Sequence, residues 1–333
     1  MHGLADSPSR VDEGKLPEGE FAVLSRREDE VFAARDILGT RGLYLDGTGS
    51  FASDVRLLSG RGRLLAPGTI FVDGKVLRAR LPRAALPDSF EEAAATLGGI
   101  LEESVRRRVA DRKKVAISFS GGLDSSLVAM LAARHARVVL CSAFSKGALD
   151  ERQSSRAAEQ LGLEWTGSTV DREAVSALSK GMGLPFEPNV MDRALWAIYS
   201  TTARVASDRG AEVILLGQLA DELFGGYRKY ALEAKTDPRS AVRMMEEDVK
   251  GCATRGFIRD ETACAAWVEP RFPFADSAVA VFAKAIPLEY KIRGEERKSV
   301  LRAAAMGLGL PESLANAPKK AAQFSSGIAK LAG

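Results

Sequence analysis

The sequence contains few of the residues on which metal centres and histidine-based catalysis depend. Its 333 residues include two histidines and three cysteines. The cysteines, Cys141, Cys252 and Cys264, have no spacing typical of metal ligands, and they are most simply thiols of a protein in a reducing cytoplasm. This composition excludes most Cys/His metal sites and most chemistry that needs a histidine base.

Long apolar runs and a strong excess of one charge are also missing. No stretch of eighteen apolar residues occurs, and the first residues lack the apolar core of a signal peptide, so neither a membrane segment nor secretion is predicted. The 47 basic and 44 acidic residues are interleaved and give a formal net charge of +3, which provides no evident footprint for nucleic acid. We expect a cytoplasmic globular protein with room for one large or two modest domains.

What the sequence does contain is a phosphate-loop pattern. The apolar run Val115–Phe119 is followed by Ser-Gly-Gly-Leu-Asp-Ser-Ser at residues 120–126, and a helical apolar pattern begins there. A strand, a tight glycine turn and a helix N-terminus present free backbone N–H groups and the positive end of a helix dipole to an anion. The three serines add hydroxyl donors, and Asp124 could hold Mg²⁺ beside phosphates. The same residues could also form an ordinary capped connection, because Ser and Asp are common at helix starts.

Strands and helices alternate along most of the chain. We predict strands at 115–119, 138–141, near Trp165 and at 213–216, with helices from Ser125, over 150–161 and over 192–207 between them. This alternation favours an α/β fold with a parallel twisted sheet and helices on both faces. Ligands of such sheets bind beyond the carboxyl ends of the strands, where the phosphate-loop pattern and the residues after Leu216 both lie.

The predicted organisation has three parts. Residues 1–19 are polar and rich in Gly, Pro, Asp and Glu, and we expect them to be mobile. Residues 20–88 form a small β-rich domain, with a hairpin over residues 69–79 that turns at Asp-Gly-Lys and a proline-containing linker at its end. A helix over residues 90–110 opens the α/β domain, which we place at residues 89–333.

A second pattern follows the strand that ends at Leu216. It reads Gly217-Gln218-Leu219-Ala220-Asp221-Glu222-Leu223-Phe224-Gly225-Gly226-Tyr227. If the two strands are neighbours, Asp221 lies near Asp124, and the two carboxylates could share Mg²⁺, which takes one or two protein carboxylates plus phosphate oxygens. Taken alone, the segment could equally be a helix start with acidic residues near the dipole, followed by a glycine stop. Its occurrence beside the phosphate-loop pattern in one α/β chain weakens that alternative.

A lysine pair near the C-terminus is the third pattern. Lys319 and Lys320 stand in Pro-Lys-Lys-Ala-Ala-Gln-Phe-Ser-Ser-Gly. A lysine beside the phosphates would neutralise charge that develops on a departing pyrophosphate. Most such pairs belong to solvated basic tails, but the small and apolar residues that follow this one indicate an ordered segment.

Together these segments resemble the synthetase domain of the class B asparagine synthetase family. Residues 120–126 are similar to its pyrophosphate loop, and residues 217–227 to its Gly-x-Gly-x-Asp-Glu-x-Phe-Gly-Gly-Tyr signature. Arg-Phe-Pro-Phe-Ala-Asp at 271–276 resembles its Arg-x-Pro-Phe-Leu-Asp segment, and Lys-Ser-Val-Leu-Arg at 298–302 resembles its Lys-x-x-Leu-Arg helix. The resemblance covers roughly residues 92–330 in the family's order, and it implies an ATP-pyrophosphatase fold of the adenine nucleotide alpha hydrolase type.

The resemblance also implies an enzyme that uses ATP to form an amide. A carboxylate (the aspartate side chain in the namesake enzymes) attacks the α-phosphate of MgATP, and ammonia or another amine then attacks the acyl-adenylate, giving an amide, AMP and pyrophosphate. Asp124 and Asp221 would hold magnesium, and Lys320, or alternatively Lys319, would contact the α-phosphate and the leaving pyrophosphate. The remaining nucleotide contacts implied are those of the pyrophosphate loop, Ser120, Gly121, Gly122, Leu123, Asp124, Ser125 and Ser126, and of the backbone at Ala143, Leu216 and Gly217 near the adenine and ribose.

One departure from the family's pattern concerns the N-terminal region. Full-length members begin with a cysteine that hydrolyses glutamine, in a domain roughly twice as long as the one available here. This chain begins Met-His-Gly and has no cysteine before Cys141, although residues 30–80 resemble the latter half of that domain. We therefore expect a truncated glutaminase fold without its nucleophile, and no glutaminase activity. A separate glutaminase acting in trans and a homodimer both stay open.

A second departure is Gln218, which stands where synthetases of the family usually carry a glutamate that assists deprotonation of the amine. An amide cannot act as a base near neutral pH. Free ammonia could attack without that help, Glu222 or water could serve, or the substrate could be different.

Three functions are therefore compatible with the sequence. The first is an ammonia-dependent, asparagine-synthetase-like ligase, and the second is an adenylating amide ligase or cyclase on another carboxylate, as in β-lactam synthetases and lasso-peptide cyclases. The third is a nucleotide-binding module that has lost catalysis, which the presence of Asp124, Asp221 and the lysine pair speaks against. A tRNA-modifying enzyme is disfavoured by the near-neutral charge.

Overall fold

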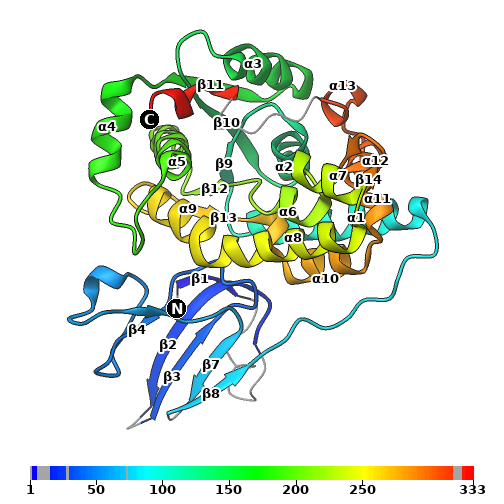
Figure 1. The fold of residues 1–333 in the computed structure, drawn as a ribbon. Coiled ribbons are helices and arrows are strands. Elements are labelled where there is room, and N and C mark those ends of the chain that lie inside the picture. Colours follow the sequence, from blue (N-terminus) through cyan, green and yellow to red (C-terminus); the bar gives the residue numbers. More distant parts are fainter. Residues whose placement is uncertain (1, 6–15, 28–29, 73, 318–324) are drawn as a thin grey trace.

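The fold consists of a parallel α/β unit and a smaller antiparallel β unit packed beneath it (Figure 1). The computed structural model describes residues 2–5, 16–27, 30–72, 74–317 and 325–333. Within these residues, no helix is both long enough and apolar enough to cross a membrane.

The parallel sheet has the strand order β11-β10-β9-β12-β13. Its central strands β10, β9 and β12 are buried on both faces, which explains their near-continuous apolar sequences, whereas the edge strand β11 is partly exposed. The chain leaves β9 toward one edge of the sheet and leaves β12 toward the other, so the carboxyl ends of these two neighbours form the topological switch point. The strands are β9 (Lys114–Ser118), β10 (Arg137–Phe144), β11 (Glu164–Thr169), β12 (Val213–Leu215) and β13 (Glu269–Arg271).

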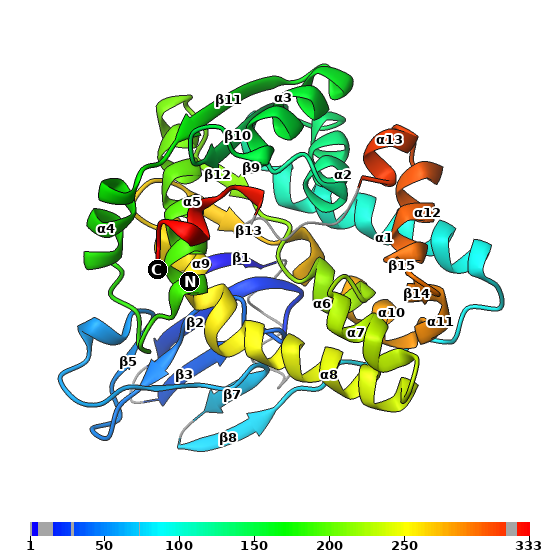
Figure 2. The same ribbon diagram turned by 45° about the horizontal axis from the view of Figure 1, so that its top comes forward.

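Helices cover both faces of this sheet. Right-handed crossovers place α2 and α3 on one face and α5 and α9 on the other. In Figure 2 the C-terminal turn η5 (Ile328–Lys330) lies beside α5, with which it packs. The helices are α1 (Phe90–Val109), α2 (Leu123–Ala133), α3 (Leu149–Leu161), α4 (Arg172–Lys180), α5 (Val190–Asp208), α6 (Ala220–Phe224), α7 (Arg228–Ala234), α8 (Pro238–Gly251), α9 (Phe257–Cys264), α10 (Ser277–Ala285), α11 (Leu288–Lys291), α12 (Ser299–Gly307) and α13 (Glu312–Ala315).

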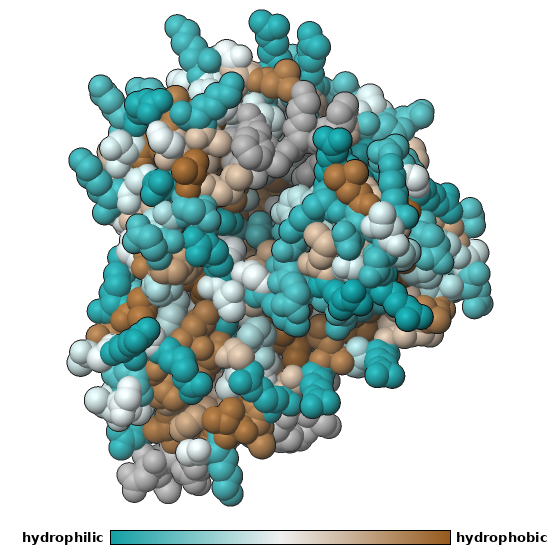
Figure 3. Space-filling model, in the orientation of Figure 1, coloured by the Kyte–Doolittle hydropathy of each residue, from teal (hydrophilic) through white to brown (hydrophobic). Residues whose placement is uncertain are grey.

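The small unit is built on the antiparallel sheet β1-β2-β3-β7-β8, with a second sheet β5-β4-β6 beside it. Figure 3 shows apolar side chains gathered over this lower part of the molecule. In this unit Leu24, Val76 and Leu77 are each about half exposed. The strands are β1 (His2–Ala5), β2 (Gly19–Arg27), β3 (Glu30–Arg35), β4 (Tyr44–Leu45), β5 (Phe51–Ala52), β6 (Arg63–Leu64), β7 (Thr69–Val72) and β8 (Lys75–Arg78); a further short pair, β14 (Ile292–Arg293) and β15 (Glu296–Arg297), precedes α12.

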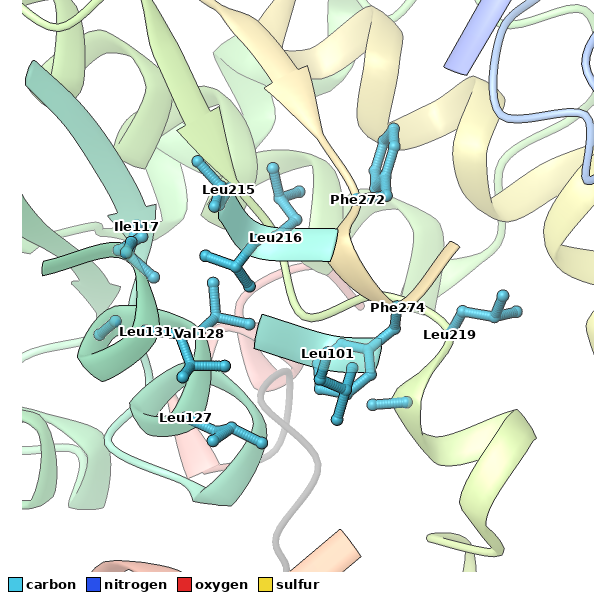
Figure 4. Packing of buried hydrophobic residues seen from close by; sticks show 14 of the residues in the cluster. Leu101, Ile117, Leu127, Val128, Leu131, Leu215, Leu216, Leu219, Phe272 and Phe274 are labelled. Atoms are coloured by element: carbon cyan, nitrogen blue, oxygen red, sulfur yellow. The ribbon is translucent and has the colours of Figure 1, made fainter. Parts of the chain in front are cut away.

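The main core lies between the parallel sheet and the helices that cover its two faces. Leu127, Val128 and Leu131 of α2 meet Ile117 of β9, and Leu101 of α1 closes the layer (Figure 4). These side chains are almost completely buried. Burial of each one stabilises the folded state by roughly 1.5–3 kcal/mol. The packing fixes the start of α2, and with it the loop that precedes the helix.

A buried ionic network joins the two units. Glu20 of β2 accepts from Arg108 of α1 at 2.5 Å and lies 3.4 Å from the guanidinium of Arg41. Arg41 also donates to the Pro270 carbonyl at 2.6 Å. Because burying such charges is costly unless they are paired, these contacts fix one relative position of the two units.

The structure confirms the α/β fold class and the parallel sheet, and the predicted hairpin is present as β7 and β8. Two helix starts differ from the prediction. Helix α2 begins at Leu123 rather than at Ser125, because Gly122 takes the N-cap position, and α5 begins at Val190 rather than near Asp192, because Asn189 and Asp192 form a capping box. The predicted mobile segment 1–19 contributes β1, which pairs with β2, and most of that segment lies outside the described residues.

Candidate functional site

The candidate site is a cavity at the switch point of the parallel sheet. Its volume is about 470 Å³, which is in the range of small-molecule sites. One end is formed by the loops after β9, β10 and β12, and the other by α6, the end of α8 and the start of α9. The first end includes Ser118, Ser120, Asp124, Ser125, Ser142, Ala143 and Gly217, and the second Gln218, Glu222, Tyr227, Lys229, Asp248, Cys252, Arg255 and Arg259.

The phosphate loop has the shape that the sequence predicts. Gly121 has a positive φ of 71°, and a Cβ on it would stand 2.8 Å from the Gln153 carbonyl, so this position requires glycine. The hydroxyls of Ser120 and Ser125 lie 3.2 Å apart. The hydroxyl of Ser126 is buried and has no hydrogen-bond partner among the described residues. A buried hydroxyl without a partner is unusual; Ser120 and Ser125 line the cavity, whereas Ser126 does not.

Two predicted metal ligands, Asp124 and Asp221, converge on one cation. The ammonium of Lys298 lies 2.7 Å from each carboxylate oxygen of Asp124 and 2.6 Å from Oδ1 of Asp221. The lysine side chain is 2% exposed, so this is a partly buried triad of two carboxylates and one ammonium. The strand neighbours β9 and β12 bring the two aspartates together, as the sequence predicts.

Backbone conformation around the triad is constrained. Leu219 and Lys298, which precede α6 and α12, are the non-glycine residues with positive φ in the described part of the chain, at 79° and 62°. Such conformations cost energy and concentrate at functional sites. A Cβ on Gly226 would stand 1.9 Å from Oδ1 of Asp221 and 2.4 Å from Cε of Lys298. The backbone of Gly226 therefore lies directly against Asp221 and Lys298.

The residues predicted to lie near adenine and ribose are adjacent to this loop. Ala143 is the penultimate residue of β10, and Gly217 is the second residue after β12, with its Cβ position 3.3 Å from Cβ of Asp124. The side chain of Leu216 is buried in the core, so only its backbone is available to a ligand. Ser142 donates to the Phe119 carbonyl at 2.6 Å and accepts from Trp165, which fixes the wall beside Ala143.

The far end of the cavity contains Glu222 and Gln218. Burial first, and then the charge of Asp221, raise the pKa of Glu222, and the Tyr227 hydroxyl donates to its carboxylate at 2.7 Å. The side-chain amide of Gln218 donates to Sγ of Cys252 at 3.6 Å. The carboxyl group of Glu222 therefore has a pKa above its usual value. Gln218, four residues earlier in the chain, carries an amide that cannot titrate.

Charged side chains of both signs surround this end. Arg255 and Arg259 share Asp192, through contacts of 3.0 Å and 3.2 Å. Across the cavity Lys229 pairs with Asp248, which also accepts from Tyr230. The arrangement can receive a small ligand that carries a carboxylate and an ammonium group.

The lysine pair Lys319 and Lys320 lies outside the described residues, and its role stays a prediction. In the part of the chain that the structure describes, no three His, Cys, Asp or Glu side chains form a metal cluster.

Three features of the site were missed by reasoning from the sequence. Lys298 stands in the Lys-x-x-Leu-Arg motif, which names it but gives no position relative to Asp124. Tyr227 ends the second pattern, but its bond to Glu222 needs the turn at Gly225 and Gly226. The π-turn over Cys252–Gly256 has no sequence signal, although such turns are frequent at functional sites.

Comparison with known proteins identifies relatives of this chain. The family model described as asparagine synthase matches residues 96–255 and 243–332. This chain belongs to the asparagine synthase family. A putative glutamine-hydrolysing asparagine synthetase of Methanocaldococcus jannaschii is 31% identical over an alignment 281 residues long, which covers 73% of this chain and 51% of that protein. An asparagine synthetase of Saccharomyces cerevisiae is 25% identical over 96% of this chain and 66% of its own length.

The chain therefore spans about half to two thirds of the length of these family members. Among solved structures, that of NMN synthetase from Francisella tularensis aligns with 71% of this chain and 77% of that one, at a TM-score of 0.37 and 13% identity.

Proposed function

We propose that this member of the asparagine synthase family is an ATP-dependent ligase that adenylates a carboxylate and transfers the acyl group to ammonia. The observation that carries this proposal is the convergence of Asp124 and Asp221 on one cation beside the phosphate loop. That arrangement stands at the switch point of a parallel sheet, where such folds bind their ligands.

The phosphate loop would hold the β- and γ-phosphates of ATP. Its backbone N–H groups and the start of α2 favour an anion, and the serine hydroxyls add donors. Ala143 and Gly217 border the space for adenine and ribose. Lys298 supplies positive charge at the phosphates, as the predicted contact of Lys320 or Lys319 also would.

The residues present fit Mg²⁺ as well as ATP. Asp124 and Asp221 would hold the ion in the space that the Lys298 ammonium occupies in this structure, 2.6–2.7 Å from their oxygens, and the ammonium would then turn toward the phosphates. Magnesium at this point would bind phosphate oxygens and stabilise the charge on the leaving pyrophosphate.

The charged far end of the cavity favours an amino acid as the acyl substrate, most simply one similar to aspartate. Arg255 and Arg259 provide positive charge for its α-carboxylate, and Asp248 provides negative charge for its α-ammonium group. The side-chain carboxylate would then point toward the phosphate loop. Its oxygen attacks the α-phosphorus, and the bond to pyrophosphate breaks.

The second half-reaction needs a group that accepts a proton from the attacking amine. Gln218 cannot do this, so we assign the role to Glu222, whose raised pKa makes its carboxylate a stronger base than an ordinary glutamate. Tyr227 orients that carboxylate through its hydrogen bond. Attack by ammonia on the acyl carbon forms the amide and releases AMP.

A second candidate function is amide formation with a different acid or within one substrate. Gln218, in place of the family's glutamate, is the observation that favours it. A cyclase would catalyse exchange of pyrophosphate into ATP with its own acid but would need no added ammonia.

The test is exchange of labelled pyrophosphate into ATP with a panel of carboxylic acids, with and without ammonia. We expect aspartate to stimulate exchange and asparagine to appear only when ammonia is added. Asp124→Ala should abolish exchange, whereas Asp208→Ala, at the exposed end of α5, should leave it unchanged. Binding of ATP without exchange for any acid would instead favour a module that has lost catalysis.

A further inference from the structure

Arg35, at the end of β3, connects the N-terminal unit to the wall of the cavity. Its side chain is fully buried. The guanidinium donates to the carbonyls of Arg41, Leu65 and Gly39 at 2.5–2.6 Å, all within the small unit. A further bond of 2.6 Å reaches the carbonyl of Ala253, 218 residues further along the chain.

Ala253 belongs to the π-turn between α8 and α9. The turn spans Cys252–Gly256, and Figure 1 shows α8 and α9 at the boundary between the two units. On its cavity side the turn packs closely on Gln218: a Cβ on Gly256 would stand 2.8 Å from the amide nitrogen. Turns of this type are uncommon and less stable than a continuous α-helix, so a hydrogen bond to one of their carbonyls matters for their position.

The loop that follows β3 in the small unit also binds α9, the helix after the turn. The backbone N–H of Gly42 donates to Glu261 of α9 at 2.9 Å, and Arg41 lies 3.6 Å from that carboxylate. The loop therefore contacts α9 at Glu261, and Arg35 at the end of β3 contacts the π-turn at Ala253. Of these contacts, the bond from Arg35 is the one that reaches the turn lining the cavity.

We propose that Arg35 is a positioning residue for the acyl-substrate end of the cavity, acting through the Ala253 carbonyl on the π-turn. The N-terminal unit then serves the synthetase site even though we expect it to lack glutaminase activity. Arg35 holds the turn so that Cys252 and Arg255 face Gln218 and the bound acid. The naming of that end as the acyl subsite rests on the proposed function, whereas the position of the turn can be measured without it.

Cys252 reports the position of the turn directly. The test compares Arg35→Lys with Arg41→Lys, because both arginines are fully buried and each donates across the interface, one to Ala253 and the other to Pro270. Native protein is treated with iodoacetamide, and alkylation of each cysteine is followed by peptide mass spectrometry. Cys141 and Cys264 are buried and serve as internal references.

In Arg35→Lys we expect alkylation of Cys252 to accelerate about ten-fold, the factor that follows from losing one buried hydrogen bond to a charged donor. Cys141 and Cys264 should keep their rates, and Arg41→Lys should leave Cys252 within about two-fold of the wild type. Equal acceleration in both variants, or an unchanged rate at Cys252 in Arg35→Lys, would overturn the proposal.

Pyrophosphate exchange then separates positioning from a general loss of structure. We expect Arg35→Lys to raise KM for the acid about ten-fold and to leave KM for ATP unchanged, because the nucleotide end rests on β9 and β12. If the wild type shows no exchange, the proposed function fails, and the Cys252 rates still decide the role of Arg35. Arg35→Gln replaces Arg35→Lys if the latter does not fold; failure of both beside a folded Arg41→Lys would also refute a role confined to the turn.

Discussion

Gly226→Ala perturbs the charged triad without removing any charge. The new Cβ would stand 1.9 Å from Oδ1 of Asp221 and 2.4 Å from Cε of Lys298. Ordinary carbon–oxygen contacts lie at about 3.3 Å or more, so the carboxylate must retreat by ~1.4 Å. Carbon–carbon contacts begin near ~3.5 Å, so the lysine must also move by ~1 Å. The 2.6 Å contact between Lys298 and Asp221 cannot survive both shifts.

The expected loss of activity follows from this displacement. A misplacement of ~1 Å in a positioned group costs on the order of 100-fold in rate, which corresponds to ~2.7 kcal/mol of transition-state stabilisation. We therefore expect pyrophosphate exchange by Gly226→Ala to fall about 100-fold, with the larger part of the effect in kcat. The fold should persist, because the clash lies at the cavity rather than in the core.

The assay is exchange kinetics at saturating ATP, with thermal unfolding measured in parallel. Gly307→Ala is the matched control, since Gly307 ends α12, the helix that follows Lys298, and a Cβ there meets no atom within 4 Å. Gly226→Ala with wild-type exchange and wild-type stability would refute the view that the geometry of Asp124, Lys298 and Asp221 determines the chemistry.

Three further variants test the charged triad, the phosphate loop and Glu222. Lys298→Met should lower exchange at least ~100-fold by removing charge stabilisation at the phosphates, whereas Lys284→Met, at an exposed lysine, should not. Gly121→Ala combines a positive φ with a contact of 2.8 Å to the Gln153 carbonyl, and urea unfolding should show a loss of ~2 kcal/mol together with weaker ATP binding by calorimetry. Because burial raises the pKa of Glu222, the folded chain keeps a proton that the unfolded chain loses, and stability falls as pH rises through the unfolded and then the folded pKa. Glu222→Gln removes this loss, so its Tm should exceed that of the wild type near pH 8 but not near pH 4.

The parallel sheet and the phosphate loop could be predicted because local sequence determines them. The apolar run before Ser120 can only be a buried strand, and Gly121 stands where a positive φ is needed. The meeting of Asp124 and Asp221 could also be predicted, once β9 and β12 were assumed to be neighbours, since parallel strands end at one edge of a sheet. These inferences required no knowledge of side-chain packing.

The rest of the site depends on contacts between distant segments. Lys298 reaches Asp124 from 174 residues away, and Arg35 reaches Ala253 across 218 residues. No periodicity or spacing in a single sequence encodes such a distance. The π-turn could not be predicted either, because its residues resemble a continuation of α8 into α9. In the structure the turn contacts Gln218 and Arg35, which lie far from it in the sequence.

In the proposed reaction, a carboxylate oxygen of the substrate attacks the α-phosphate of ATP. The most direct measurement uses aspartate labelled with ¹⁸O in its side-chain carboxylate, together with ATP, Mg²⁺ and ammonia, followed by mass spectrometry of the nucleotide product. Adenylation predicts AMP that carries one ¹⁸O atom, with pyrophosphate unlabelled. Label in inorganic phosphate with ADP as the nucleotide product, or AMP without label, would contradict it.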